Sequence, residues 1–269
     1  MLKIETINFS SWPIKEYIEQ VLLITPKRKG LPVRLVHYPQ SSEMLVFNVG
    51  LKDVQEDGEE VGTCHYFCGK NETNNVYTVS LNEPICIVQF KAHAWFAFGK
   101  NAPASYANRV VRLSCCVGES LHAFIEQVLP DHLLRYLKLG KTKDAAYAKM
   151  PQMLRYIDDN LNTVNVMQLS RAFQTSEATL RRYFKKYIGM NVSLYIRNRK
   201  IKCMTLRMYQ QDYNALSVQE CGFYDQSHFI REFKRVHQTT PTQFLNNLKR
   251  MFRDDPNAER LFNACYIEG

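Results

Sequence analysis

The sequence lacks the features that would place the protein in a membrane, outside the cell or among enzymes with a recognisable motif. No apolar run approaches the roughly 18 residues that a membrane-spanning helix needs. The first twenty residues contain no basic stretch followed by an apolar core, so we expect no secretory signal. A phosphate-binding glycine motif, an HExxH motif and a nucleophile elbow are all missing. We therefore expect a cytoplasmic protein without catalytic activity or a cofactor.

Cysteine is present, but not in the arrangement of a disulfide framework or a zinc site. Cys115 and Cys116 are adjacent and the other six are scattered, which in a chain this long indicates a reducing compartment. Cys64, His65 and Cys68 lie close in sequence, but no second pair follows at zinc-site spacing, so buried thiols are expected there. The histidines on the expected strands form no His-x-His pair, and no metal site is predicted: His37, His65 and His93.

The net charge of +9 is concentrated in one part of the chain. Residues 151–250 carry 16 lysines and arginines against 7 acidic residues, whereas residues 1–150 carry 17 against 15 and residues 251–269 carry 2 against 4. A surface that binds a polyanion is therefore expected within residues 151–250. Charge alone leaves a solvated basic face as the alternative.

The first 140 residues are predicted to contain mainly short strands. Runs rich in β-branched and aromatic residues alternate with turn formers, which is typical of a β-barrel or sandwich. The clearest runs are residues 33–40, 43–50, 74–81 and 84–92. Hairpin-like loops are expected at residues 55–62 and 69–75, and helices near residues 14–23, 119–129 and 131–139. The polar or small residues 141–149 are the expected linker.

From Met150 onward the spacing of apolar residues changes to that of helices. Ser176 suits the N-cap of one helix, Gly189 suits its C-terminal cap, and Thr240 suits the N-cap of a helix that begins at Pro241. The predicted helices cover about residues 150–160, 165–173, 177–188, 192–209, 215–221, 225–237 and 241 onward.

Two segments of this helical region repeat at an offset of 49 residues. The matched pairs are Leu180 with Phe229, Arg182 with Arg231, Phe184 with Phe233, Lys185 with Lys234, Lys186 with Arg235, and Tyr195 with Phe244. Each copy combines a short helix, a turn and a second helix with a basic outer face. This order predicts two helix-turn-helix units.

At these residues the sequence resembles the AraC/XylS family of bacterial transcription regulators. The second copy matches the family signature at Gly222-Phe223, Ser227-His228-Phe229, Arg231-Glu232-Phe233-Lys234-Arg235 and Thr240-Pro241. The first copy matches at Leu169-Ser170, Ser176, Leu180, Arg182, Phe184-Lys185, Gly189 and Arg199. The resemblance covers about residues 150–250. It implies two recognition helices in the major groove, held about one DNA turn, roughly 34 Å, apart by the helix at 192–209.

The sequence departs from the family pattern at two places. Ser217-Val218 stands where the supporting helix of the second unit usually carries Ile-Ala, and the connection before it is one residue short. Gln238 stands where the family favours Gly, with Thr239 before Thr240-Pro241. Both departures concern the packing of the second unit and leave its outer face unchanged.

Residues 1–140 resemble, more loosely, the cupin-like β-barrel sensors found ahead of such DNA-binding units. The expected fold class is thus α+β with two domains: a cupin-like sensor or dimerisation domain (1–140), the linker (141–149), a tandem helix-turn-helix domain (150–250) and a C-terminal extension (251–269). Six aromatic residues could line an effector pocket or simply form the core of the barrel: Phe47, Tyr66, Phe67, Trp95, Phe96 and Phe98.

The resemblance assigns the DNA-reading residues to the two recognition helices. The candidates for base edges are Ala178, Thr179, Arg181, Arg182, Gln226, Ser227, His228 and Arg231. The candidates for phosphates are Lys185, Lys186, Lys234 and Arg235. Salt bridging within the domain is the alternative for Arg182 and Arg231, and simple solvation is the alternative for the lysines. Arg199 lies inside the linker helix and is expected to be structural.

The expected partners follow from this assignment. They are double-stranded DNA, a small-molecule effector, and, by family resemblance, RNA polymerase and a second copy of the chain; no membrane is expected. Two other functions remain open: a DNA-repair alkyl acceptor with a zinc-bound cysteine, and a metabolite-binding protein that has lost DNA binding. The residues leave open whether transcription is activated or repressed.

Overall fold

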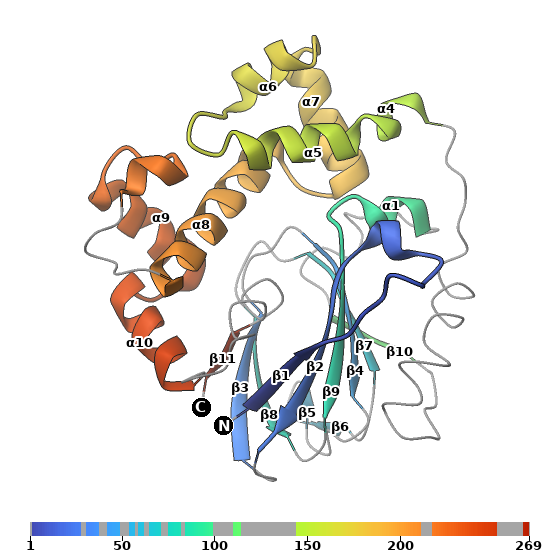
Figure 1. The fold of residues 1–269 in the computed structure, drawn as a ribbon, viewed down its shortest axis with the longest axis vertical. Helices are drawn as coiled ribbons and strands as arrows, with labels where there is room; N and C mark the ends of the chain where they lie inside the picture. The colour runs from blue at the N-terminus through green and yellow to red at the C-terminus, as the bar shows by residue number, and fades with distance from the viewer. Residues whose placement is uncertain are drawn as a thin grey trace.

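The computed structural model divides the chain into an N-terminal region of β-sheets and a C-terminal region of helices (Figure 1). It describes residues 2–27, 31–37, 42–48, 54–56, 59–61, 65–70, 75–81, 84–98, 110–113, 144–210, 217–251 and 266–268. The expected helices at 119–129 and 131–139 lie outside these residues. No helix in the described ranges is long and apolar enough to cross a membrane.

The larger sheet has six antiparallel strands in the order β1-β2-β9-β4-β7-β10. Its strands are β1 (Leu2–Thr6), β2 (Ile18–Pro26), β9 (Ile85–Phe90), β4 (Met44–Asn48), β7 (His65–Cys68) and β10 (Val110–Leu113). All six residues of β9 are buried, so both faces of the sheet are covered at this strand. The strands expected around residues 43–50 and 84–92 are confirmed.

The helix expected near residues 14–23 is wrong. A short 3₁₀ turn, η1 (Lys15–Tyr17), leads directly into β2, which pairs with β1 on one side and β9 on the other. Ile18 and the four residues Val21–Ile24 are all buried. A short apolar run of this kind fits a central strand as well as a helix, and periodicity alone does not separate the two.

A second sheet has the order β11-β3-β8, formed by β3 (Leu31–His37), β8 (Asn75–Leu81) and β11 (Tyr266–Glu268). The expected strands at 33–40 and 74–81 are therefore confirmed, and the C-terminal extension contributes β11 to this sheet beside β3. The hairpin at 55–62 is confirmed by the pairing of β5 (Val54–Glu56) with β6 (Glu59–Val61). The hairpin expected at 69–75 is wrong, because β7 and β8 belong to different sheets.

The helical region follows the sequence pattern closely. It contains α4 (Ala145–Ala148), α5 (Met150–Asp159), α6 (Val166–Ala172), α7 (Glu177–Tyr183), the π-helical turn η4 (Phe184–Ile188), α8 (Val192–Gln210), the 3₁₀ turn η6 (Val218–Cys221), α9 (Gln226–His237) and α10 (Pro241–Met251). From Asp144 onward the stretch expected as a linker is helical, because the Asp144 carboxylate caps α4 by accepting from the backbone N–H groups of Ala146 and Tyr147. The α+β fold class is confirmed.

One continuous hydrophobic core joins the two regions. It extends from Trp12 and Phe90 in the sheet region to Tyr187 and Ile196 in the helical region. The short helix α1 (Ala94–Phe98) lies between the end of the sheet and the first helices of the C-terminal region (Figure 1). There the Phe96 ring meets the Tyr187 ring edge-on, with 4.8 Å between centroids.

Candidate nucleic-acid interface

The first helix-turn-helix unit, the first module, consists of α6 and α7. Asn165 caps α6 through a capping box in which its side chain accepts from the Gln168 N–H while the Gln168 side chain accepts from the Asn165 N–H. The turn passes through Gln174, whose φ of 48° is left-handed. Ser176 then caps α7 by accepting from the Thr179 N–H, as predicted. The Asn165 cap fixes the start of α6, and the Ser176 cap fixes the point where the turn ends and α7 begins.

The second module consists of η6 and α9. Its supporting element is a single 3₁₀ turn followed by Gly222 at φ 78°. Asp225 caps α9 by accepting from the His228 N–H at 2.6 Å. The left-handed residue lies three positions before the N-cap here and two positions before it in the first module. The two turns therefore differ by one residue, whereas the connection before Ser217-Val218, which is expected to be one residue short, lies outside the described residues.

The 49-residue repeat holds in three dimensions. Each matched apolar pair is buried: Leu180 with Phe229, Phe184 with Phe233, and Tyr195 with Phe244. Each matched cationic pair is exposed: Arg182 with Arg231, Lys185 with Lys234, and Lys186 with Arg235. The repeat also covers the caps, because Ser176 corresponds to Asp225, and Gly189 at φ 85° corresponds to Gln238 at φ 54°. Both second helices therefore present equivalent faces.

Helix α8 joins the modules and is held by contacts along its length. Its 19 residues give it a length of about 28 Å, close to the roughly 34 Å repeat of DNA. Arg199 donates to the Asp158 carboxylate at 2.7 Å, so the structural role expected for Arg199 is confirmed. Lys200 donates to the Gly222 carbonyl at 3.4 Å, and a Cβ on Gly222 would lie 2.4 Å from the Leu161 carbonyl oxygen. The second module thus packs against both α8 and the loop after α5.

The candidates for base contacts lie at or near the first turns of α7 and α9. Ala178, Arg182, Gln226, Ser227 and Arg231 are exposed, whereas Thr179 and His228 are half-buried. Arg181 is exposed and pairs with Glu177 at 3.4 Å. Within the part of the chain that the structure describes, neither Arg182 nor Arg231 forms an ion pair with a carboxylate. That arrangement leaves both guanidinium groups available for guanine or phosphate.

All four phosphate candidates are exposed: Lys185 and Lys186 lie in η4, directly after α7, and Lys234 and Arg235 lie in α9. Lys186 donates to the Asp144 carboxylate at 2.7 Å and to the Tyr187 hydroxyl at 3.3 Å. Tyr187 also donates to Asp144, at 2.8 Å, and these hydrogen bonds lower the pKa of Asp144 to about 2. Lys186 therefore ties the first module to the start of the helical region. Sequence reasoning missed Asp144, because no local pattern links residues 42 positions apart.

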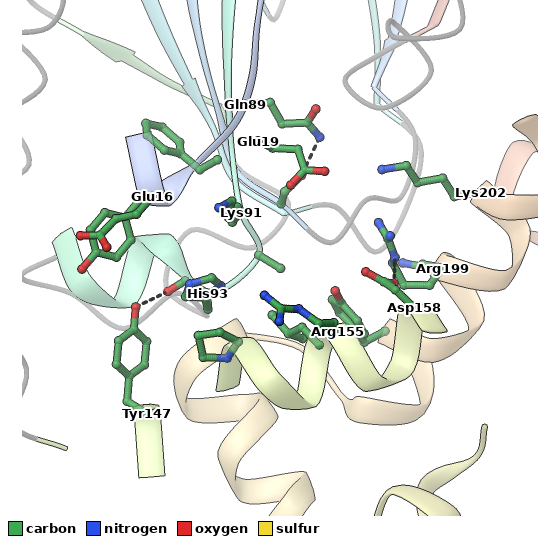
Figure 2. Close-up of a pocket in the computed structure, with 18 of the residues that line it drawn as sticks. Glu16, Glu19, Gln89, Lys91, His93, Tyr147, Arg155, Asp158, Arg199 and Lys202 are labelled. Carbon is green, nitrogen blue, oxygen red and sulfur yellow. Dashed lines mark hydrogen bonds and ion pairs between the residues drawn. The ribbon is translucent and has the colours of Figure 1, made fainter. Parts of the chain in front are cut away.

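A cavity of about 630 Å³ lies between the end of the larger sheet and the helical region. Figure 2 shows Glu19, Gln89 and Lys91 on the sheet side, and Arg155, Asp158, Arg199 and Lys202 on the side of α5 and α8. Tyr147 closes one side by donating to the His93 carbonyl at 3.1 Å. The cavity is thus built from both regions of the molecule.

The cavity contains two basic groups with lowered pKa values. Burial lowers the pKa of Lys202 to about 7, helped by the nearby charge of Arg199. Burial also lowers the pKa of His93 to about 4, with the charges of Lys91 and Lys70 adding to the effect. Neutral forms of both groups are therefore accessible near physiological pH. Among the residues with described positions, no three His, Cys, Asp or Glu side chains gather as a metal site would require.

The aromatic residues expected to line an effector pocket lie outside this cavity wherever their side chains are described. Phe47, Tyr66 and Phe67 are buried, and Trp95 stacks on Phe67 with 4.1 Å between centroids. Phe96 packs against Tyr187, and the side chain of Phe98 lies outside the described atoms. None of the five described side chains lines the cavity between the two regions.

Comparison with known proteins gives the type of the helical region. A family model described as a helix-turn-helix domain matches residues 169–247, from within α6 to within α10. Among curated relatives, XylDLEGF operon transcriptional activator 3 of Pseudomonas putida is 27% identical over 108 residues, which is 38% of this chain and 33% of that protein. The HTH-type transcriptional activator RhaR of Cronobacter sakazakii is 28% identical over 134 residues, 48% of this chain and 46% of that protein.

Residues 169–247 are a helix-turn-helix domain of the AraC/XylS type. The chain matches between a third and a half of the length of these relatives. Among solved structures, wild-type ToxT of Vibrio cholerae strain SCE256, determined with an unsaturated fatty acid bound, covers 91% of this chain and 94% of its own with a TM-score of 0.50. At 10% identity this likeness concerns the fold alone. The likeness extends over both the sheet region and the helical region, because it covers 91% of this chain.

Proposed function

We propose that this protein is a sequence-specific DNA-binding regulator of transcription, and that its two modules enter successive major grooves. The observation that supports it most strongly is the equivalence of the modules: Arg182 and Arg231 occupy matched, exposed positions on helices that one continuous α8 holds together. The charge of residues 151–250 supplies the attraction to phosphate. The curated relatives are transcriptional activators, so we propose activation as the outcome and expect no enzymatic activity.

Selection of binding sites from random and genomic DNA with the purified full chain tests this proposal. The expected result is a selected sequence with two short conserved blocks about 10 base pairs apart, because each module reads one major groove on the same side of the duplex. Binding should weaken steeply as salt is raised, because phosphate contacts release counterions. Recovery of no common sequence, or affinity that does not change with salt, would contradict the proposal.

We further propose that the sheet region senses a small molecule, and that this effector enters the cavity between the two regions. Ligand pockets are preferentially formed at domain interfaces, and a ligand here would touch the ends of η1 and β9 together with α5 and α8. A molecule bound at this place contacts the helix that sets the spacing of the modules. Such a ligand can change DNA affinity only if it makes different contacts with the conformation that binds DNA and the conformation that does not.

A cavity-filling variant with a matched control tests the location. Ala148 lines the cavity, whereas Ala145 is exposed on the same short helix α4 and does not. A panel of small carboxylates, amines and sugars is tested for a rise in melting temperature of the parent, Ala148→Trp and Ala145→Trp. We expect a compound that stabilises the parent and Ala145→Trp but leaves Ala148→Trp unchanged. An equal rise in Ala148→Trp would place the effector elsewhere.

A further inference from the structure

Two thiols meet where the second module packs on the linker helix. Cys203 lies in α8 and Cys221 is the last residue of η6, and their sulfur atoms are 3.4 Å apart. Both are free cysteines. They approach each other although 17 residues separate them in sequence, because η6 packs against α8. This contact is unrelated to the DNA-reading faces of α7 and α9.

The two thiols have unequal surroundings. Cys203 is half-buried and Cys221 is fully buried. Cys203 accepts a hydrogen bond from the Cys221 thiol, and this bond lowers the pKa of Cys203, with the charges of Arg207 and Arg199 adding to the effect. The same hydrogen bond and burial raise the pKa of Cys221. Arg207 is itself held in place by an ion pair with Glu220 in η6.

This asymmetry is the arrangement that a reactive pair of thiols requires. The nucleophilic form of cysteine is the thiolate, which cationic neighbours and hydrogen bonds stabilise. Oxidant-sensitive cysteines combine thiolate character with solvent access and often lie beside a second cysteine that resolves the oxidised form. Cys203 meets the first two conditions, and Cys221 meets the third.

We propose that Cys203 and Cys221 form a peroxide-responsive dithiol site that closes reversibly to a disulfide between α8 and η6. In the first step the Cys203 thiolate attacks one oxygen of hydrogen peroxide, the O–O bond breaks, and the departing hydroxide takes a proton to become water. The Cys203 sulfur is thereby oxidised to a sulfenic acid. In the second step the Cys221 sulfur attacks the Cys203 sulfur, the S–O bond breaks, and the hydroxyl leaves as water with the proton of Cys221. A dithiol reductant returns both residues to thiols.

Closure needs only a small movement. The sulfur atoms must move together from 3.4 Å to the roughly 2.05 Å of a disulfide bond. Helix α9 follows its N-cap Asp225 and so begins after Cys221 and the turn at Gly222 and Phe223. The disulfide would therefore involve no residue of the DNA-reading helix. It would fasten the supporting turn of the second module to the linker helix, and cross-linking restricts the unfolded chain. We expect the oxidised protein to melt at a higher temperature than the reduced protein.

The chain provides two internal controls. Cys68 and Cys86 are buried in the larger sheet, and burial raises the pKa of each to about 12. Neither has the hydrogen bond or the arginine neighbours of Cys203 among the described contacts. A general sensitivity of the protein to peroxide would modify these two residues once the chain opens, whereas a built site would modify Cys203 in the folded state.

The test uses the full chain with the four cysteines outside the described residues changed to serine: Cys64, Cys115, Cys116 and Cys265. The folded protein is treated with a small excess of hydrogen peroxide and mapped by mass spectrometry without reduction. We expect a Cys203–Cys221 linked peptide that disappears with dithiothreitol, while Cys68 and Cys86 remain thiols. The melting temperature should rise on oxidation and fall back on reduction.

Four further variants separate the steps. Cys221→Ser should accumulate a sulfenic acid at Cys203 that dimedone traps, and Cys203→Ser should give neither adduct nor rise in melting temperature. Arg207→Ala should slow the formation of the disulfide several-fold, and Arg207→Lys should restore the rate. The proposal is overturned if Cys203 is oxidised no faster than Cys68 or Cys86 in the folded chain. It is also overturned if Cys221→Ser, confirmed as folded, yields no trapped sulfenic acid.

Discussion

The two helix-turn-helix modules share one sequence pattern but are held by different surroundings. The first module packs into the core that joins the sheet and helical regions, through Tyr187 against Phe96 and through Lys186 and Tyr187 to Asp144. The second module packs on α8, α10 and the loop that contains Leu161. The first module is therefore positioned by contacts that reach the sheet region, and the second by contacts within the helical region, to α8, α10 and the loop after α5.

This difference indicates how the two halves of the reading surface could be influenced separately. The cavity between the two regions is lined by residues of α4, α5 and α8, of which α5 packs on α6 of the first module and α8 packs on η6 and α9 of the second. A change at the Cys203–Cys221 contact acts on the second module directly. The following substitutions test two points. The first is whether the buried aromatic residues of the two modules contribute equally to stability, and the second is whether the contacts that hold each module in place differ.

The largest effect is expected from the matched aromatic residues at the centre of each module. Phe184 and Phe233 are both fully buried, so Phe184→Ala and Phe233→Ala should each lower the free energy of unfolding by about 3–5 kcal/mol. Phe184→Ala should also loosen the adjacent Tyr187 contact to the sheet region. Urea titrations followed by circular dichroism measure both losses, and hydrogen exchange at Tyr147 and Tyr187 should increase in Phe184→Ala alone.

The next largest effect is expected at the turn of the second module. Gly222→Ala places a Cβ 2.4 Å from the Leu161 carbonyl oxygen at a left-handed φ of 78°. Left-handed backbone and overpacking together should cost about 3 kcal/mol of stability. Gln238→Ala is the matched control, since Gln238 already has a left-handed φ without being glycine. Equal melting temperatures for Gly222→Ala and the parent would show that the turn relaxes away from Leu161.

A smaller effect is expected where Asp144 joins the first module to the start of the helical region. Asp144→Ala removes the N-cap of α4 and should cost about 1 kcal/mol, whereas Asp144→Asn keeps a capping side chain and removes the charge. The pKa of Asp144 is lowered to about 2 in the folded protein, mainly by the hydrogen bond from Lys186 and next by that from Tyr187. The ionised Asp144 carboxylate therefore stabilises the folded protein at pH values above about 3.9, the pKa of aspartate in the unfolded chain. This stabilisation is lost as the pH falls toward 2.

The stability difference between the parent and Asp144→Asn should accordingly be constant above about pH 5 and shrink between pH 4 and pH 2. Denaturant titrations at several pH values measure this difference. A difference that does not change over this range would mean that Lys186 and Asp144 are not paired in solution.

The smallest effect is a gain in stability at the C-terminal cap of α9. Gln238 takes the left-handed conformation that Gly189 takes in the first module. Gln238→Gly should remove that backbone strain, and the strain is larger than the extra conformational entropy that glycine loses on folding. The free energy of unfolding should therefore rise by about 0.5 kcal/mol. Gly189→Gln, the reverse exchange, should lower it. A loss of stability in Gln238→Gly would show that the Gln238 side chain has a structural role.

The helical region could be predicted from sequence because the residues that begin and end each helix lie within a few positions of it. The caps at Ser176 and Thr240, the glycine at Gly189 and the 49-residue repeat each specify an element through neighbours within a few residues. Gln238 could be identified as a departure for the same reason, although its left-handed φ became visible only in the structure.

The sheet region was less predictable because its partners are distant in sequence. The apolar run of β2 fits a helix as well as a strand from sequence alone, because only its pairing with β9 decides that it is a strand. The strand β11 could not be expected, because it pairs with β3 more than 200 residues earlier. The functional sites differ in the same way. The recognition helices could be predicted from the repeat, whereas the cavity between the two regions and the Cys203–Cys221 contact depend on residues that only tertiary packing brings together.

The measurement that tests the central claim most directly is a footprint of each arginine variant on the selected operator. Arg182→Ala and Arg231→Ala should each weaken binding by about 1–3 kcal/mol, or roughly 5- to 150-fold, and each should lose protection over a different half of the site. Lys15→Ala, which removes an exposed charge from the sheet region, should change neither. If Arg231→Ala is folded and protects both halves with the affinity of the parent, the second helix does not read DNA and the claim of two equivalent reading helices is wrong.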